Sequence, residues 1–255
     1  MFSYYGSKSK VVDLYPSPKF GKIIEPFAGS ARYSLKYFDR DVLLVDKYQV
    51  IVDVWHYLQQ ASEADILKLP KMKHGDKVSN YKSLSQVEAW FLGFLVTGGV
   101  ESPRDNVASF DGVNVEKDLR RISKNISKIR HWKIMQGTYA DIENQEATWF
   151  IDPPYQFGGE AYKMNNKGWD YSKLAEWCIS RSGQIIVCEN TKADWLQFYP
   201  MREMRGSQHK TVEAIWSNYR HDYQAVQSSM FEARHLTQRA GDTATPSDNA
   251  TVLHK

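Results

Sequence analysis

The sequence has few cysteines and no long hydrophobic run. Its 255 residues include 2 cysteines, Cys178 and Cys188, which are too few for a disulfide scaffold or a four-thiolate zinc site. No apolar stretch approaches the ~20 residues of a membrane span, and the N-terminus lacks the apolar core of a signal peptide. We therefore expect reduced, buried cysteines in a cytoplasmic protein of a bacterial cell or phage-infected host, with no membrane partner and no metal.

An excess of one charge sign is also missing. The chain has 33 Lys and Arg against 30 Asp and Glu, a net charge of +3, and a pI near 8.6. This mild basicity permits a polyanionic partner but does not demonstrate one. Because 42% of the residues are hydrophobic, the chain can bury a substantial core. The composition is typical of an intracellular enzyme.

Apolar runs and amphipathic stretches alternate along the chain. Strands are predicted at 22–26, 42–46, 133–136, 147–151, 184–188 and 212–217. Helices are predicted at about 31–38, 48–60, 84–96, 115–131 and 170–182. Alternation of this kind predicts an α/β fold, with a sheet flanked by helices.

One segment interrupts the alternation. Residues 62–131 are predicted to contain helix and loop only, so we interpret them as an insert in a catalytic domain formed by residues 1–61 and 132–235. Residues 236–255 are rich in Thr, Ala, Asp, Ser and Asn and have few bulky apolar side chains. That composition predicts a disordered tail.

The most informative motif is Asp152-Pro153-Pro154-Tyr155. It follows the apolar run 148–151, so it is predicted at the end of a buried strand, where α/β sheets place their chemistry. Two prolines force a rigid turn and leave carbonyl groups as acceptors. Asp152 and the Pro153 carbonyl can accept from an exocyclic amine, and Tyr155 offers a face on which a base can stack. The motif suits methylation of a nucleobase amine; the alternative is a strand-ending turn with a capping aspartate.

A second pattern points to a nucleoside-like ligand. An apolar run at 22–25 is followed by a turn of small residues, and the next apolar run ends at Asp46. In nucleotide-binding βαβ units a carboxylate at that place holds ribose hydroxyls, but the glycines of the dinucleotide pattern are missing here. The pattern favours a nucleoside rather than a pyrophosphate, although ordinary strand-to-helix packing also produces it.

These motifs occur in a characteristic order. Tyr4-Tyr5-Gly6-Ser7-Lys8, Glu25-Pro26-Phe27-Ala28-Gly29-Ser30, Asp46 and then Asp152 to Tyr155 resemble the Dam-like DNA adenine-N6 methyltransferases of the alpha class, in particular short bacteriophage-type members. The resemblance covers roughly residues 1–230. It implies a Rossmann-like S-adenosylmethionine-dependent methyltransferase sheet with a helical and loop target-recognition insert at 62–131. The implied activity is site-specific methyl transfer to adenine N6 in double-stranded DNA, by base flipping and direct in-line transfer.

The resemblance also assigns residues to roles. It implies that S-adenosyl-L-methionine is bound by Tyr4, Lys8, Glu25, Phe27, Gly29, Asp46 and Asp141. It implies that catalysis involves Asp152, Pro153 and Tyr155. Two positions depart from the family pattern: Tyr4 replaces a Trp, and Ala31 stands where a further Gly is frequent. Tyr4 keeps an aromatic wall, whereas Ala31 restricts the turn because alanine resists positive φ.

The insert contains candidate DNA-binding residues. Basic side chains recur at helical spacing along one face of 115–131, and aliphatic side chains recur along another. We interpret Lys117, Arg120, Arg121 and Lys124 as phosphate-binding residues; the alternative is a solvated helix face. Arg104, in a loop upstream, is predicted to contact a guanine edge or a phosphate.

Three further functions share parts of this pattern. Cytosine-N4 methyltransferases use similar geometry but usually carry Ser at the position of Asp152. The second is methylation of RNA or protein amines, and the third is a catalytically silent DNA-binding module of the same fold. The sequence predicts a monomer or weak dimer, and it is compatible with restriction-modification, gene regulation or protection of a phage genome.

Overall fold

The computed structural model of this chain describes residues 1–2, 4–109, 112–159, 167–205 and 210–219. The predicted tail at 236–255 and the end of the predicted catalytic domain at 220–235 lie outside the described residues.

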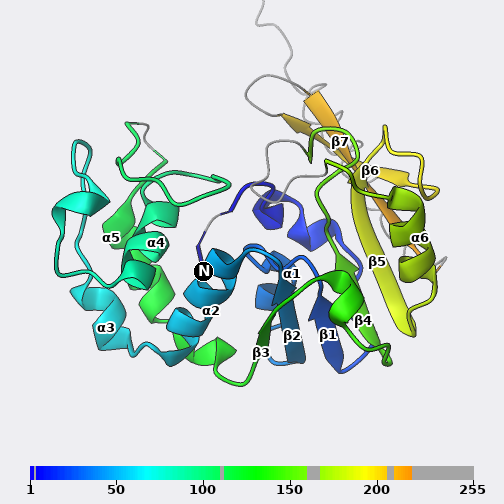
Figure 1. The fold of residues 1–255 in the computed structure, drawn as a ribbon, viewed down its shortest axis with the longest axis horizontal. Coiled ribbons are helices and arrows are strands. Elements are labelled where there is room, and N and C mark those ends of the chain that lie inside the picture. Colours follow the sequence, from blue (N-terminus) through cyan, green and yellow to red (C-terminus); the bar gives the residue numbers. More distant parts are fainter. Residues whose placement is uncertain (3, 110–111, 160–166, 206–209, 220–255) are drawn as a thin grey trace, which may run out of the picture.

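A seven-stranded sheet forms the centre of the fold, with the strand order β3-β2-β1-β4-β5-β7-β6 (Figure 1). The strands are β1 (Lys22–Glu25), β2 (Asp41–Asp46), β3 (Lys133–Gln136), β4 (Ala147–Ile151), β5 (Gly183–Asn190), β6 (Tyr199–Arg205) and β7 (Lys210–Ser217). Strands β1 to β5 pair in parallel, and β7 is antiparallel to both β5 and β6. The predicted Rossmann-like α/β fold is confirmed.

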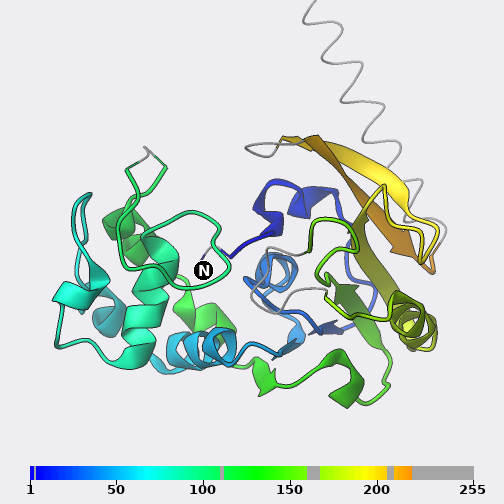
Figure 2. The same cartoon turned by 45° about the horizontal axis from the view of Figure 1, so that its top comes forward.

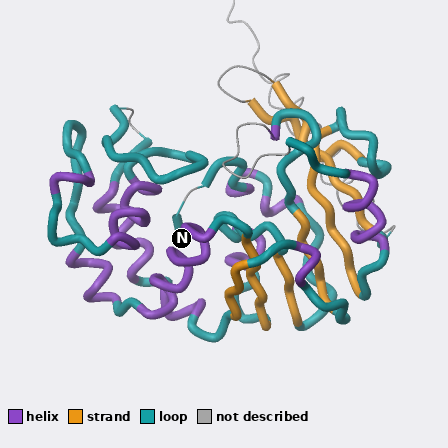
Figure 3. The backbone as a smooth tube through the Cα atoms, viewed as in Figure 1, coloured by secondary structure: helices purple, strands orange, loops and turns teal. Residues whose placement is uncertain are grey.

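Helices occupy two regions of the molecule. The helices are α1 (Arg32–Lys36), α2 (Gln49–Gln60), α3 (Glu63–Lys68), α4 (Gln86–Leu95), α5 (Val115–Ser123) and α6 (Tyr171–Ile179). Short 3-10 turns are η1 (Lys8–Lys10), η2 (Val12–Leu14), η3 (Val78–Asn80), η4 (Ile126–Ile129) and η5 (Tyr139–Asp141). Figure 3 shows α3, α4 and α5 grouped on one side of the molecule and the sheet on the other.

Three elements differ from the sequence prediction. Strand β6 was not predicted, because Pro200 and several charged residues are atypical of strands; both are tolerated here because β6 is an edge strand, and its pairing is irregular between Pro200 and Arg202. Helix α3 was also missed. Helix α5 ends at Ser123 rather than 131, since the Asn125 side chain donates to the Arg121 carbonyl (2.7 Å) and the chain continues as η4.

The order of the strands reverses beside β1. This strand pairs with β2 on one side and with β4 on the other, so the connections leave the sheet in opposite directions. In open parallel sheets, the loops that follow the strands on either side of such a reversal leave a crevice between them. The carboxyl ends of β1, β2, β3 and β4 meet at this crevice.

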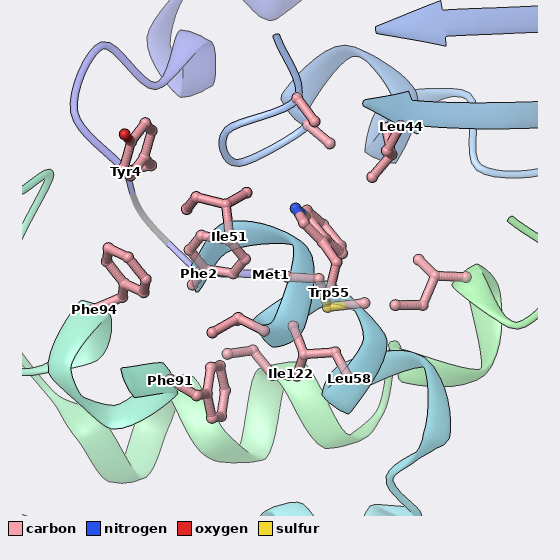
Figure 4. Close-up of a cluster of buried hydrophobic side chains, with 14 of the residues drawn as sticks. Met1, Phe2, Tyr4, Leu44, Ile51, Trp55, Leu58, Phe91, Phe94 and Ile122 are labelled. Atoms are coloured by element: carbon pink, nitrogen blue, oxygen red, sulfur yellow. The ribbon is translucent and has the colours of Figure 1, made fainter. Parts of the chain in front are cut away.

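The first residues of the chain help to join the sheet to residues 62–131. Met1 and Phe2 are buried among side chains of α2, α4 and α5, including Trp55, Phe94 and Ile122 (Figure 4). The rings of Phe2 and Phe94 stack with centroids 5.3 Å apart. Residues 62–131 therefore share a continuous core with α2 rather than having a separate one; Figure 2 shows their helices beside α2. None of the helices described is long and apolar enough to cross a membrane.

Candidate active site

A cavity of about 380 Å³ lies at the carboxyl ends of β1 to β4. This volume falls within the range of roughly 300–1,000 Å³ typical of small-molecule sites. Four connections line it: the turn after β1, Asp46 to Tyr48 after β2, Gly137 to Ala140 after β3, and Asp152 and Pro154 after β4. The N-terminal segment 4–8 and residues 168–170 complete the wall.

The turn after β1 is held against an aromatic ring. Gly29 has φ of 42°, and a Cβ atom there would lie 3.0 Å from Cδ1 of Tyr4. The buried Trp55 donates from Nε1 to the Gly29 carbonyl (2.9 Å). Ala31 also adopts a positive φ, of 44°, which side chains disfavour. The missing glycine at this position therefore leaves a strained alanine in the turn.

Asp46 closes the same turn from the end of β2. Its Oδ2 accepts from the Gly29 N–H (2.9 Å) and its Oδ1 from the Tyr48 N–H (2.8 Å). Burial raises the pKa of Asp46 to about 6, while the two backbone donors lower it. Each carboxylate oxygen keeps a further lone pair, so Asp46 can accept ligand hydroxyls as well.

Three aromatic rings form a neighbouring wall. The Phe27 ring centroid lies 5.9 Å from that of Tyr139 and 5.6 Å from that of Trp169, and all three residues line the cavity. Their placement suits an apolar, planar ligand group. Phe27 was predicted from the sequence, whereas Tyr139 and Trp169 were not.

Asp141 differs from the expectation. Its Oδ2 accepts from the backbone N–H (2.7 Å) and hydroxyl (2.8 Å) of Thr138, so its exposed carboxylate caps η5 instead of lining the cavity. These hydrogen bonds hold its pKa below the usual value. The two residues form a capping box: Asp141 follows Thr138 by three residues, so its carboxylate can accept from the backbone N–H and hydroxyl at the start of η5.

Asp152 forms a buried ion pair with Lys8. The Lys8 Nζ atom lies 2.8 Å from Oδ1 of Asp152, and Lys8 is 6% exposed. The same Nζ stands over the Tyr155 ring, 4.8 Å from its centroid. Burial raises the pKa of Asp152 to about 6; the Lys8 ammonium lowers it, and the Glu213 carboxylate raises it.

The other predicted residues of the tetrapeptide are placed differently. Tyr155 is not among the residues that line the cavity, and the Lys8 ammonium stands over its ring. Pro154 lines the cavity and Pro153 does not; the Pro154 carbonyl accepts from the Tyr171 hydroxyl (2.7 Å). The tetrapeptide is thus fixed by α6 on one side and by the N-terminal segment on the other.

A second carboxylate stands behind the ion pair, and sequence reasoning missed it. Glu213, on β7 and 7% exposed, accepts at Oε1 from the hydroxyls of Tyr15 and Tyr155, each at 2.6 Å. The same oxygen lies 3.6 Å from the Lys8 Nζ. Its signal in the sequence is a lone carboxylate within the apolar strand 212–217, because a buried charge needs partners.

Two further carboxylates are buried near the site. Glu25 accepts from the Ser34 N–H (2.7 Å), and burial raises its pKa to about 8. Glu189, at the end of β5, accepts from the backbone of Gln156 and Asn190, and burial raises its pKa to about 7. Glu189 therefore anchors the chain immediately after the tetrapeptide. Within the described ranges, no group of three His, Cys, Asp or Glu side chains is arranged to hold a metal ion.

The predicted basic residues lie on the surface of residues 62–131. Lys117, Arg120, Arg121 and Lys124 are exposed along α5, whereas Val115, Leu119 and Ile122 on its other face are buried. Both arginines carry acidic neighbours: Arg120 pairs with Glu116 and Arg121 with Asp118, each at 2.7 Å. Arg121 also donates to the Met1 carbonyl (3.0 Å).

Arg104, which was predicted to contact a guanine or a phosphate, lies outside α5. Arg104 pairs with Glu101 at 2.5 Å. Lys117 and Lys124 therefore carry the least compensated of the predicted positive charges, since neither forms an ion pair within the described part of the chain.

The chain is similar to known proteins only at the level of solved structures. No protein-family model matches the sequence, and no curated protein matches it. Among solved structures, the chain is similar to a candidate methyltransferase, yhhF of Escherichia coli, with 9% identity and a TM-score of 0.35; the match covers 82% of this chain and 78% of that one. It is also similar to a candidate methylase, HI0767 of Haemophilus influenzae, with 10% identity, a TM-score of 0.34 and coverages of 77% and 78%.

Proposed function

We propose that this protein transfers a methyl group from S-adenosylmethionine to the exocyclic N6 amine of adenine in double-stranded DNA. The proposal rests on one observation above all: the Asp152 carboxylate lies at the end of a buried parallel strand and lines a cavity that also contains the Asp46 carboxylate. One carboxylate suits an amine donor and the other suits the hydroxyls of a nucleoside.

The cavity fits the cofactor in chemical terms. Asp46 retains lone pairs for ribose hydroxyls, and the rings of Phe27, Tyr139 and Trp169 offer apolar surface for an adenine ring. Gly29 brings backbone close to that ligand, since a side chain at this position would meet Tyr4. When bound, S-adenosylmethionine supplies an electrophilic methyl group on a sulfonium, which is already a good leaving group.

The residues of this chain then act by orientation. An adenine amine inside a duplex is inaccessible, so the base must be flipped out of the stack. Its N–H group donates to the ionised Asp152 carboxylate, and this hydrogen bond aims the nitrogen lone pair at the incoming methyl carbon. Asp152 need not be a strong base, because the nitrogen becomes acidic only once it is methylated.

Adenine is favoured over other amines by the residues of the motifs. The order of the N-terminal motif, the β1 turn, Asp46 and the tetrapeptide resembles that of the Dam-like enzymes, and Asp152 stands where cytosine-N4 enzymes usually have Ser. DNA as the partner is supported by the exposed lysines of α5, because basic side chains that follow phosphates supply most nonspecific affinity.

Nucleoside mass spectrometry tests this proposal. Unmethylated duplex DNA is incubated with the protein and S-adenosylmethionine, with Asp152→Ala as the control variant. N6-methyladenine made by the intact protein and not by Asp152→Ala is the expected result. Cofactor affinity of the variant is measured by calorimetry, and unchanged affinity shows that the loss is not a folding defect.

Each remaining outcome favours a different function. N4-methylcytosine would move the assignment to the cytosine enzymes. Cofactor binding without a modified DNA base would favour RNA or protein amines. A protein that binds DNA but not the cofactor would be a silent DNA-binding module.

A further inference from the structure

The Lys8 ammonium lies beside the two groups that are predicted to hold the acceptor base, the Asp152 carboxylate and the Tyr155 ring. Its Nζ is 2.8 Å from Asp152, within hydrogen-bond distance of the predicted amine acceptor, and it covers the Tyr155 face predicted to stack against the base. An amine cannot donate to that Asp152 oxygen from the same position while Lys8 is there. An acceptor amine that takes this position on Oδ1 therefore displaces the ammonium.

A destination for the ammonium is present in the same cluster. Oε1 of Glu213 lies 3.6 Å from Lys8 Nζ, so the lysine stands between two carboxylates and is closer to Asp152. A small displacement of a flexible side chain transfers the ion pair from one carboxylate to the other. Without a second carboxylate, the displaced ammonium would lose its counter-charge in a buried site, which is costly.

Glu213 also holds the hydroxyl of Tyr155, the tyrosine beside the ion pair. Its Oε1 accepts from the hydroxyls of Tyr155 and Tyr15, and Tyr15 is 3% exposed. The Tyr15 ring packs edge-on against Phe150 of β4, with centroids 5.0 Å apart, so Tyr15 links Glu213 to the strand that precedes Asp152. Glu213 is held on β7, two strands away from the β4 end that carries Asp152.

We propose that Glu213 is a positioning residue of this site: it takes over the Lys8 ammonium when an acceptor amine binds to Asp152, and it fixes the Tyr155 ring through its hydroxyl. This inference rests on the proposed function, because it concerns the amine acceptor of the same cavity. Asp152 and Glu213 thus share one lysine. This arrangement favours ligands that donate a hydrogen bond to Asp152, because only such ligands replace the ammonium there.

The test uses Glu213→Gln, with Glu203→Gln as its matched control. Glutamine keeps an oxygen that can accept from the two tyrosines but removes the charge that receives the ammonium. Glu203 is exposed on the adjacent strand β6, so its substitution makes the same chemical change outside the cluster. Both variants are compared with the full-length protein in single-turnover methylation at saturating cofactor.

The expected result is a loss of acceptor reactivity without a loss of cofactor binding. In Glu213→Gln, Lys8 stays on Asp152 and competes with the amine, so kcat/KM for the acceptor falls about ten- to a hundredfold, the range of a charged hydrogen bond. The cofactor affinity of Glu213→Gln changes by less than about twofold, and so does kcat/KM of the Glu203→Gln control. In a Lys8→Met background, Glu213→Gln has little further effect, because the two residues act as a unit.

A second readout does not depend on activity. The Asp152 carboxylate is titrated by ¹³C nuclear magnetic resonance, with Asp152→Asn for assignment. Two charged groups shift its pKa: the Lys8 ammonium lowers it and the Glu213 carboxylate raises it. The other titratable groups around it are Tyr15, Glu25, Tyr155, Cys188 and Glu189. Glu213→Gln is expected to lower the pKa of Asp152, since the neighbouring negative charge is gone and Lys8 remains; a merely structural role would not move it.

The two proposals fail in different ways. If the intact protein methylates nothing, the proposed function fails, while a lowered Asp152 pKa in Glu213→Gln still supports the role of Glu213 in the lysine–carboxylate cluster. An unchanged Asp152 titration, or acceptor kinetics equal to those of the intact protein, would overturn the role of Glu213. A loss of reactivity in Glu213→Gln that persists in full in the Lys8→Met background would overturn it as well.

Discussion

The Lys8 ammonium and the Asp152 carboxylate are 2.8 Å apart, although the two residues lie 144 positions apart in the sequence. The pair is largely buried, so its two charges depend on each other more strongly than a surface pair would. Burial sets the Asp152 pKa at about 6 despite the opposing effect of Lys8.

This pKa predicts the pH dependence of the reaction. The ionised carboxylate is the acceptor, so kcat/KM should decrease about tenfold per pH unit below about 6, as Asp152 becomes protonated. Lys8→Met removes the charge that lowers the pKa, so it should move this acid limb to higher pH. Methylation rates at limiting DNA concentration between pH 5 and 9 measure both effects, and a flat profile below pH 6 would contradict the assignment.

A substitution in the β1 turn tests the contact between the N-terminal segment and the cavity. Gly29→Ala should destabilise the fold by about 1–2 kcal/mol from its positive φ alone, with a further cost because the new Cβ crowds Tyr4. Cofactor affinity should fall as well, because the turn shifts. Gly21→Ala is the control: no atom lies within 4 Å of its added Cβ. Urea unfolding and calorimetry compare the two, and equal effects would refute the argument.

At Ala31 we expect the opposite effect on stability when alanine is replaced by glycine. Because its φ is 44°, Ala31→Gly should relieve backbone strain of about 1–2 kcal/mol, from which about 0.4–1 kcal/mol is lost through the greater freedom of glycine in the unfolded chain. The net result should be a modest gain in stability, measured as a higher urea midpoint at unchanged slope. A lower midpoint would mean that the alanine methyl group, which is buried, contributes more by packing than the strain costs.

The buried carboxylates predict how stability changes with pH. The pKa of Glu25 is about 8 in the folded protein against about 4.5 in the unfolded chain, so the folded state holds a proton that the unfolded state has released. Stability should therefore fall as pH rises from about 4.5 to 8. Asp46, Asp152 and Glu189 contribute with the same sign, since their pKa values are also raised.

Glu25→Gln isolates the largest of these contributions. Glutamine can still accept from the Ser34 N–H but carries no charge, so the variant should be more stable than the original at pH 8 and less dependent on pH. Each unit between the two pKa values corresponds to about 1.4 kcal/mol. Thermal unfolding at pH 5, 6.5 and 8 measures the change; the exposed Glu203→Gln should leave the slope as it is.

The lysines of α5 give a test of DNA binding that avoids a structural residue. Arg121 holds the Met1 carbonyl, so its reversal would perturb the core, whereas Lys117 and Lys124 are exposed. Lys117→Glu with Lys124→Glu should weaken binding to any duplex and reduce the salt slope by about 2. Lys133→Glu, at the start of β3 on the edge of the sheet away from the cavity, is the control. Unchanged affinity would make α5 an ordinary solvated helix.

Local sequence determined most of the sheet. The strands β1 to β5 are short apolar runs whose neighbours are turns and amphipathic helices, and such periodicity depends only on residues close in the chain. Tyrosine, glycine and carboxylate at the ends of these runs also indicated the cavity, because parallel strands bring their carboxyl ends to one edge. Strand β6 was not predicted, because its proline and charged residues are atypical of strands; an edge strand tolerates both.

Tertiary structure decided what each side chain in the cavity does. Asp141 was predicted to bind the cofactor, but its carboxylate caps its own turn and does not line the cavity, because Thr138 offers it two donors. Glu213 joins Lys8, Tyr15 and Tyr155 only through the pairing of β7 with β5, which no local pattern specifies. The sequence by itself determined which chemical groups are present and which edge of the sheet they reach. Their pairing and their pKa values were decided by burial, because desolvation and ion pairing depend on neighbours that are distant in the chain.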